Sequence, residues 1–158
     1  MTRDDNEDCF AIQFAHSSSE WGCDLGDINS ETNYDFVLFG DSHANTYINI
    51  VDKLASKNNK KGFFAGISGC PPLLGVNSFD PQNGPFDCEK LNERVLNFIK
   101  INKIKNLILV ARWSYYTHGD FKQQDIRFLR TDTFAQKELE SSKKAFNQGL
   151  ERTIEAYK

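Results

Sequence analysis

Apolar residues occur along the chain in two kinds of pattern. Short continuous runs of them lie at residues 36–39, 63–67 and 107–111. Runs of this length, bounded by turn-forming residues, are typical of strands buried on both faces of a sheet. Elsewhere apolar residues recur every three or four positions, which predicts amphipathic helices over residues 44–57, 88–102 and 134–157.

The order of these elements determines the expected fold class. Strands and helices alternate at a spacing of about 30 residues, which is typical of right-handed strand–helix–strand units with a parallel sheet. We therefore expect an α/β fold of three layers, with helices on both faces of the sheet. The chain ends inside the last predicted helix, so we expect the sheet to be C-terminally incomplete and to lack the strand that this helix would reach.

The first 33 residues differ from the rest of the chain. They mix acidic, serine and asparagine residues with isolated aromatic ones. This composition predicts an extended arm over residues 1–33, without regular secondary structure, followed by one domain over residues 34–158. A length of 158 residues also favours one domain over two.

The chain has four cysteines, Cys9, Cys23, Cys70 and Cys88, with no Cys-x-x-Cys spacing and no histidine placed to complete a zinc site. Disulfides therefore fit better than a metal, and we expect the local pairs Cys9–Cys23 and Cys70–Cys88. Four reduced cysteines in a cytoplasmic protein are the alternative. Oxidation implies export, but the polar start of the chain is not a signal peptide. Either the chain stays in the cytoplasm or it is part of a longer exported protein.

The charge balance and hydropathy exclude two classes of partner. Nineteen basic and 22 acidic residues give a formal net charge of −3, and no basic cluster is longer than two residues, so we expect no nucleic-acid partner. The longest apolar run, residues 107–111, is far shorter than the roughly 20 residues that cross a bilayer. We therefore expect no direct membrane insertion by this segment.

The sequence Gly40-Asp41-Ser42-His43 follows the first predicted strand. In parallel sheets, functional groups gather at the carboxyl ends of the strands. Gly40 permits a tight turn there, and Ser42 would begin the following helix, where free backbone N–H groups can stabilise an oxyanion. Ser42 is therefore a candidate nucleophile, provided that a histidine base lies within hydrogen-bond reach. The alternative is that Asp41 and Ser42 only cap the helix.

Asp41 and His43 also match the Asp-x-His motif of calcineurin-like metallophosphoesterases, in which both would bind metal. That site needs further ligands from downstream Gly-Asn-His and Gly-His motifs. Only His118 follows His43, and no Gly-Asn-His is present. We therefore expect neither a metal nor a dissociable cofactor.

Three segments in a fixed order carry a stronger resemblance. They are the turn at 40–43, a Gly-Cys-Pro-Pro segment at 69–72 and an Ala-Arg-Trp segment at 111–113, each after a predicted strand. From about Cys23 to the last residue, the chain resembles SGNH/GDSL hydrolases, specifically the SGNH domain fused to acyltransferase-3 membrane domains. The resemblance implies a flavodoxin-like fold, Ser42 as the nucleophile, and an oxyanion hole formed by the backbone N–H groups of Ser42 and Gly69.

The chain departs from the general SGNH pattern in two places. After the third strand, Arg112 and Trp113 stand where general members have an asparagine that donates to the oxyanion. The family base, a histidine in an Asp-x-x-His block, has no counterpart: we expect His16 and His118 to be surface residues and His43 to have a structural role. We therefore expect this fragment to lack full catalytic activity. Asp41, His43, Arg112 and Trp113 are candidates for substrate binding, with packing as the alternative for Arg112 and Trp113.

The resemblance implies acyl transfer. Members of this branch O-acetylate bacterial surface polysaccharides such as lipopolysaccharide O-antigen, so the implied partners are a carbohydrate acceptor, an acetyl donor and an acyltransferase-3 membrane domain. The implied location is the periplasm, as the soluble part of an inner-membrane protein. The alternative is a non-catalytic carbohydrate-binding or scaffold module, in which the aromatic side chains at 113–116 would stack on sugar rings.

Overall fold

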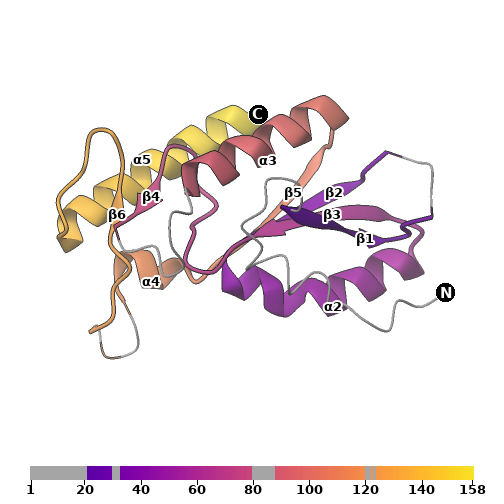
Figure 1. Cartoon of the computed structure of the whole chain (residues 1–158), viewed down its shortest axis with the longest axis horizontal. Helices are drawn as coiled ribbons and strands as arrows, with labels where there is room; N and C mark the ends of the chain where they lie inside the picture. The colour runs from indigo at the N-terminus through magenta and orange to yellow at the C-terminus, as the bar shows by residue number, and fades with distance from the viewer. Residues whose placement is uncertain (1–20, 30–32, 80–87, 120–121, 123) are drawn as a thin grey trace.

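A four-stranded sheet forms the centre of the molecule, in the order β1-β3-β2-β5 (Figure 1). The computed structural model describes residues 21–29, 33–79, 88–119, 122 and 124–158. Three strands are parallel to one another, with β2 between β3 and β5. The fourth strand, β1, pairs with β3 in the antiparallel sense. The bounds of the strands are β1 Gly22–Gly26, β2 Phe36–Gly40, β3 Lys61–Gly66 and β5 Asn106–Val110.

Helices cover both faces of this sheet. Alternate residues of a strand point to opposite faces, and in β2 Leu38 packs with Ile48 of α2 (Ser42–Lys57), whereas Val37 packs with Val95 of α3 (Cys88–Asn102). The C-terminal end of α5 (Leu139–Tyr157) also contributes to the layer that contains α3. The predicted three-layer α/β fold is thus confirmed.

A smaller group of elements lies beyond the carboxyl ends of the parallel strands (Figure 1). It contains the short helix α4 (Trp113–Thr117) and a two-stranded antiparallel sheet made of β4 (Asn77–Ser78) and β6 (Leu129–Arg130). These elements and the first half of α5 enclose a separate hydrophobic cluster around Leu73 and Tyr116. This cluster fixes the loops that follow the strands, which is where the predicted functional residues lie.

The structure corrects several expected elements. Gly22–Gly26 is a strand, although the sequence predicted an arm without regular structure, so the sheet is mixed and not purely parallel. The last helix begins at Leu139, five residues after the predicted start at residue 134. α4 and β6 lie in the stretch 112–133, for which the sequence predicted no element. The division into an arm over 1–33 and a domain over 34–158 remains a prediction, because residues 1–20 and 30–32 lie outside the described ranges.

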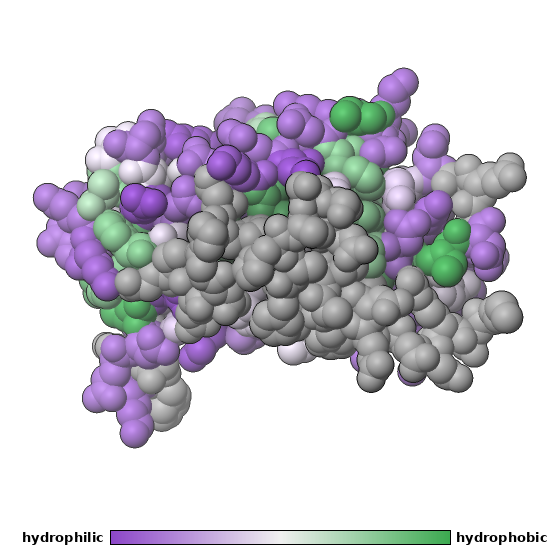
Figure 2. Space-filling view, in the orientation of Figure 1, coloured by the Kyte–Doolittle hydropathy of each residue, from purple (hydrophilic) through white to green (hydrophobic). Residues whose placement is uncertain are grey.

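The surface of the described residues is mainly hydrophilic, with a few separate hydrophobic spots on the face seen in Figure 2. Large apolar side chains at the surface include Ile50, Leu54 and Ile101. Single apolar residues at the surface are ordinary in folded proteins. Among the described residues, no helix is both long enough and apolar enough to cross a membrane.

Candidate active site

Ser42 is the first residue of α2, separated from the end of β2 only by Asp41, and it is partly exposed. The turn that leads to it depends on Gly40. A Cβ at position 40 would lie 1.7 Å from the backbone oxygen of Val110, so only glycine allows β2 and β5 to lie so close at this point. Ser42 therefore occupies the predicted place, at the carboxyl end of the central strand and at a helix N-terminus.

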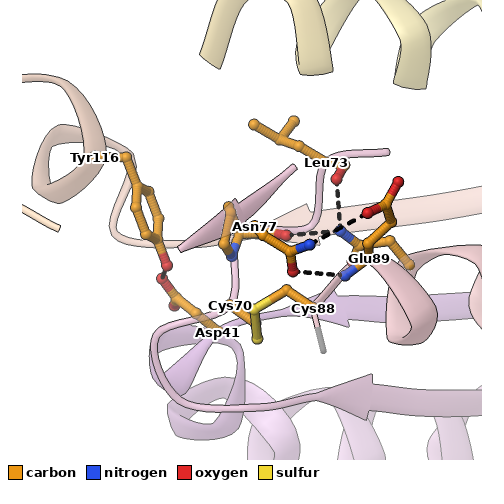
Figure 3. The surroundings of a disulfide bond; sticks show 9 residues. Asp41, Cys70, Leu73, Asn77, Cys88, Glu89 and Tyr116 are labelled. Atoms are coloured by element: carbon orange, nitrogen blue, oxygen red, sulfur yellow. Dashed lines mark hydrogen bonds between the residues drawn. A yellow bond between two sulfur atoms is a disulfide. The ribbon is translucent and has the colours of Figure 1, made fainter. Parts of the chain in front are cut away.

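The Asp41 carboxylate holds this turn in position. Asp41 is 2% exposed and caps α2, accepting a hydrogen bond from the backbone N–H of His43 at 2.8 Å. Its other oxygen accepts from the backbone N–H of Arg112 at 3.0 Å and from the Tyr116 hydroxyl at 2.7 Å (Figure 3). Asp41 thus joins the ends of β2 and β5 to α4. Substrate contact by Asp41 remains a prediction, and its geometry favours a role in positioning Ser42.

The sequence offered Tyr116 only as one of the exposed aromatic side chains that could stack on sugar rings, and the structure corrects this, because Tyr116 is buried within the site. Its side chain is completely buried, and burial raises its pKa far above the usual value; the charge of Asp41 and the hydrogen bond to it act in the same direction. The Arg127 guanidinium acts in the opposite direction. Tyr116 is therefore protonated at neutral pH and donates to Asp41. Tyr116 lies 75 residues from Asp41 in the sequence, so no local pattern could predict their hydrogen bond.

Two of the three histidines lie in the described ranges, and both are exposed. His43 Nδ1 is 3.6 Å from Asp41 Oδ1, and His118 Nδ1 is 2.8 Å from the hydroxyl of Thr117. In the described part of the chain, no hydrogen bond joins Ser42 to a histidine. His16 lies outside the described residues, so its predicted surface position stays a prediction.

The described ranges contain no group of three His, Cys, Asp or Glu side chains that could hold a metal ion. Asp41 and His43 are the two residues that a metallophosphoesterase-type site would use. Both carboxylate oxygens of Asp41 already accept hydrogen bonds from groups of the protein itself. The local geometry is therefore that of a helix cap.

Gly69 lies in the turn after β3. Its φ of 77° is in the left-handed region that favours glycine, and the turn is closed by a hydrogen bond from the N–H of Cys70 to the carbonyl of Ile67. Gly40 and Gly66 are register partners at the ends of β2 and β3. Ser42 and Gly69 therefore follow adjacent parallel strands at the same edge of the sheet, as an oxyanion hole shared by the two would require.

The loop after Gly69 is held at several points (Figure 3). A disulfide joins Cys70 to Cys88 at the start of α3, which confirms this predicted pair. Asn92 of α3 donates to the carbonyl groups of Pro71 and Leu73. Cys23 is also disulfide-bonded, whereas its predicted partner Cys9 lies outside the described residues.

The Arg112 and Trp113 side chains both contact other aromatic residues. The Arg112 guanidinium lies 4.6 Å from the centre of the Tyr115 ring, while its backbone N–H binds Asp41. The Trp113 ring meets Phe146 of α5 edge to face, at 6.0 Å between ring centres. Packing, the alternative that the sequence left open, is therefore present at both positions. Substrate contact by either residue stays a prediction.

The chain was compared with protein-family models, with curated proteins and with solved structures. One family model matches residues 7–158, and its description is SGNH domain (fused to AT3 domains). No curated protein and no solved structure gave a significant match. The match covers nearly the whole chain, including the serine turn, the Gly-Cys-Pro-Pro loop and the strand β1. The chain therefore belongs to the family of SGNH domains that are fused to AT3 domains.

Proposed function

We propose that this domain carries out serine-dependent acyl transfer, with Ser42 as the nucleophile. The SGNH family is a family of hydrolases and acyltransferases, which gives the enzyme class. The observation that carries the assignment is the placement of Ser42 at the N-terminus of α2, one residue after the buried Asp41 cap and beside the turn of Gly69. The reaction is the O-acetylation of a bacterial surface polysaccharide such as lipopolysaccharide O-antigen, or the hydrolysis of such an ester.

The chemistry proceeds in two steps. The Ser42 hydroxyl oxygen attacks the carbonyl carbon of an acetyl ester, and its proton passes to a base. The tetrahedral oxyanion is stabilised by the backbone N–H groups of Ser42 and Gly69. Its collapse breaks the ester bond, and the leaving oxygen takes the proton back from the base, so that a neutral alcohol is released and the acetyl group stays on Ser42. A sugar hydroxyl then takes the acetyl group from Ser42, or water takes it and gives acetate. Neither step calls for a cofactor.

The base is the component that the sequence leaves unassigned, because none of the three histidines stands in an Asp-x-x-His block. We therefore expect the isolated chain to react slowly. By analogy with serine proteases, the absence of the base costs on the order of 10⁶ in turnover. A small base added in solution should recover part of this loss.

The proposed partners follow from the family. SGNH domains of this kind are fused to AT3 domains, and we propose that such a membrane domain delivers the acetyl group to a carbohydrate acceptor in the periplasm. The disulfide between Cys70 and Cys88 supports an oxidising compartment, because disulfides persist there and are rare in the cytoplasm.

The test is covalent labelling with a fluorophosphonate in the presence of imidazole, which supplies a base. We expect labelling of the native chain, an increase in its rate with imidazole concentration, and no labelling of the Ser42→Ala variant. Ser56→Ala is the matched control, because Ser56 is an exposed serine in the last turns of the same helix, and this variant should label like the native protein. Peptide mapping of the adduct should identify Ser42.

Equal labelling of the native chain and of Ser42→Ala would show that Ser42 is not an activated nucleophile. The carbohydrate-binding alternative would then be favoured if the native chain still bound an acetylated polysaccharide. Binding of the polysaccharide by Ser42→Ala does not by itself distinguish the two functions, because an enzyme with an intact site also binds its substrate.

A further inference from the structure

Arg127 is a buried cation at the carboxyl edge of the sheet. It is 5% exposed, and its backbone N–H donates to the carbonyl of Tyr115 in α4 at 3.0 Å. Arginine side chains are seldom buried to this extent without a counter-ion, because removing a charge from water costs several kcal/mol. The groups that surround this guanidinium therefore indicate the role of its positive charge.

The guanidinium lies against Gly69. A Cβ at position 69 would be 3.4 Å from the guanidinium carbon, 3.5 Å from Nη2 and 3.6 Å from Nη1. Because these three distances are nearly equal, the flat face of the guanidinium covers the side of Gly69 from which a Cβ would project. A Cβ there would make only ordinary van der Waals contact with the guanidinium, so it is the φ of 77° that favours glycine at this position.

Arg127 is also close to the network that positions Ser42. Its charge acts on the buried Tyr116 hydroxyl, in opposition to the charge of Asp41. The Tyr116 hydroxyl donates to Asp41, and Asp41 caps the helix that begins with Ser42. The guanidinium thus lies against the turn of Gly69 and close enough to Tyr116 for its charge to act on the hydroxyl.

The hydrogen-bonding capacity of Arg127 is incompletely used. Its Nη1 is buried and has no hydrogen-bond partner among the described residues. Within the same ranges no carboxylate forms an ion pair with it. The guanidinium lies against Gly69 and 5.9 Å from the centre of the Tyr115 ring, and its charge and hydrogen bond act to lower the pKa of the Tyr115 hydroxyl. A buried donor without a partner is costly, so an acceptor that bound at Nη1 would be stabilised.

We propose that Arg127 is a further element of the oxyanion site, and that its guanidinium stabilises the negative charge that develops on the acyl oxygen beside Gly69. The inference rests on the proposed function of Ser42. It assigns to Arg127, through charge and the free Nη1, the stabilising role for which general SGNH enzymes use an asparagine. In this chain Arg112 and Trp113 stand in the place of that asparagine. Arg112 stacks on Tyr115 and supplies a backbone donor to Asp41 instead.

The experiment measures how fast fluorophosphonate labels Ser42 in imidazole, over a range of reagent concentrations. The Arg127→Met variant removes the charge and the donor but keeps an unbranched side chain. We expect its maximal labelling rate to fall about 100-fold, as when one oxyanion donor is lost, with a half-saturating concentration within twofold of the native value. Arg130→Met is the matched control, because Arg130 is exposed and stacks on Phe79, and it should label at the native rate.

Two further variants separate an electrostatic role from a structural one. Arg127→Lys retains the charge and should label faster than Arg127→Met. Arg127→Ala should be accelerated by millimolar guanidinium, whereas the same concentration of sodium chloride should have no effect. Circular dichroism and thermal unfolding identify any variant that has lost the fold. If Arg127→Met is unfolded, the guanidinium rescue of Arg127→Ala and the labelling rate of Arg127→Lys decide the outcome.

A native labelling rate in Arg127→Met, or equal rates in folded Arg127→Met and Arg127→Lys without guanidinium rescue, would overturn the role of Arg127 and leave Ser42 as the nucleophile. Labelling that does not depend on Ser42 at all would overturn both proposals. The two failures are therefore distinguishable in a single set of measurements.

Discussion

Replacing Asp41 by alanine is expected to lower the free energy of unfolding by about 4 kcal/mol. The variant loses the side-chain cap of α2, and it leaves the backbone N–H of Arg112 and the Tyr116 hydroxyl without their acceptor. The Tyr116 side chain is completely buried, so no water replaces the lost carboxylate. Urea unfolding monitored by circular dichroism measures the change.

The matched control for this prediction is Asp52→Ala. Asp52 lies on the same helix and accepts one hydrogen bond, from the backbone N–H of Gly26 at 2.8 Å, so its loss should cost about 1 kcal/mol. If Asp41→Ala were no less stable than Asp52→Ala, the buried carboxylate would not be holding the ends of β2 and β5 together.

A double-mutant cycle isolates the contribution of the hydroxyl. Tyr116→Phe removes only the donor, and we expect a loss of about 2 kcal/mol, as for a hydrogen bond to a charged group. In the background of Asp41→Ala the same substitution should cost much less, because the hydroxyl has already lost its acceptor. Additive effects of the two changes would contradict the network.

Most of the central fold could be predicted from local patterns in the sequence. The strand β2 and the helix α3 are found almost where the apolar runs and helical spacing placed them, because a strand buried on both faces and an amphipathic helix each impose a period on their own residues. Ser42 could be placed for the same reason: a polar turn that follows a buried strand lies at the carboxyl edge of a parallel sheet.

The features that the sequence did not predict depend on contacts between distant parts of the chain. In β1 only Cys23 and Leu25 are buried, and the strand forms because β3, almost 40 residues later, offers a free edge. Tyr116 and Arg127 lie in a stretch without helical or strand period, so nothing local distinguishes them from surface residues. Their importance comes from burial against Asp41 and Gly69, which only the folded chain creates.

Removal of the Cys70–Cys88 disulfide is expected to lower the free energy of unfolding by about 3 kcal/mol, because the bond closes a loop between cysteines 18 residues apart and restricts the unfolded chain. Both cysteines are buried, so replacement of both by alanine keeps the sites apolar. Ser42 labelling should also slow, since Cys70 directly follows Gly69. Chemical denaturation of the double variant measures the first effect, and fluorophosphonate kinetics measure the second.

The reductant dithiothreitol provides the control for the disulfide. It should destabilise the native protein by at least as much as the double substitution does, whereas in the double variant it can act only on the disulfide of Cys23. Some order should survive in the loop, because Asn92 still binds the carbonyl groups of Pro71 and Leu73. We therefore expect a folded double variant with a slower Ser42 reaction. A double variant as stable as the native protein would mean that these hydrogen bonds alone hold the turn of Gly69 in place.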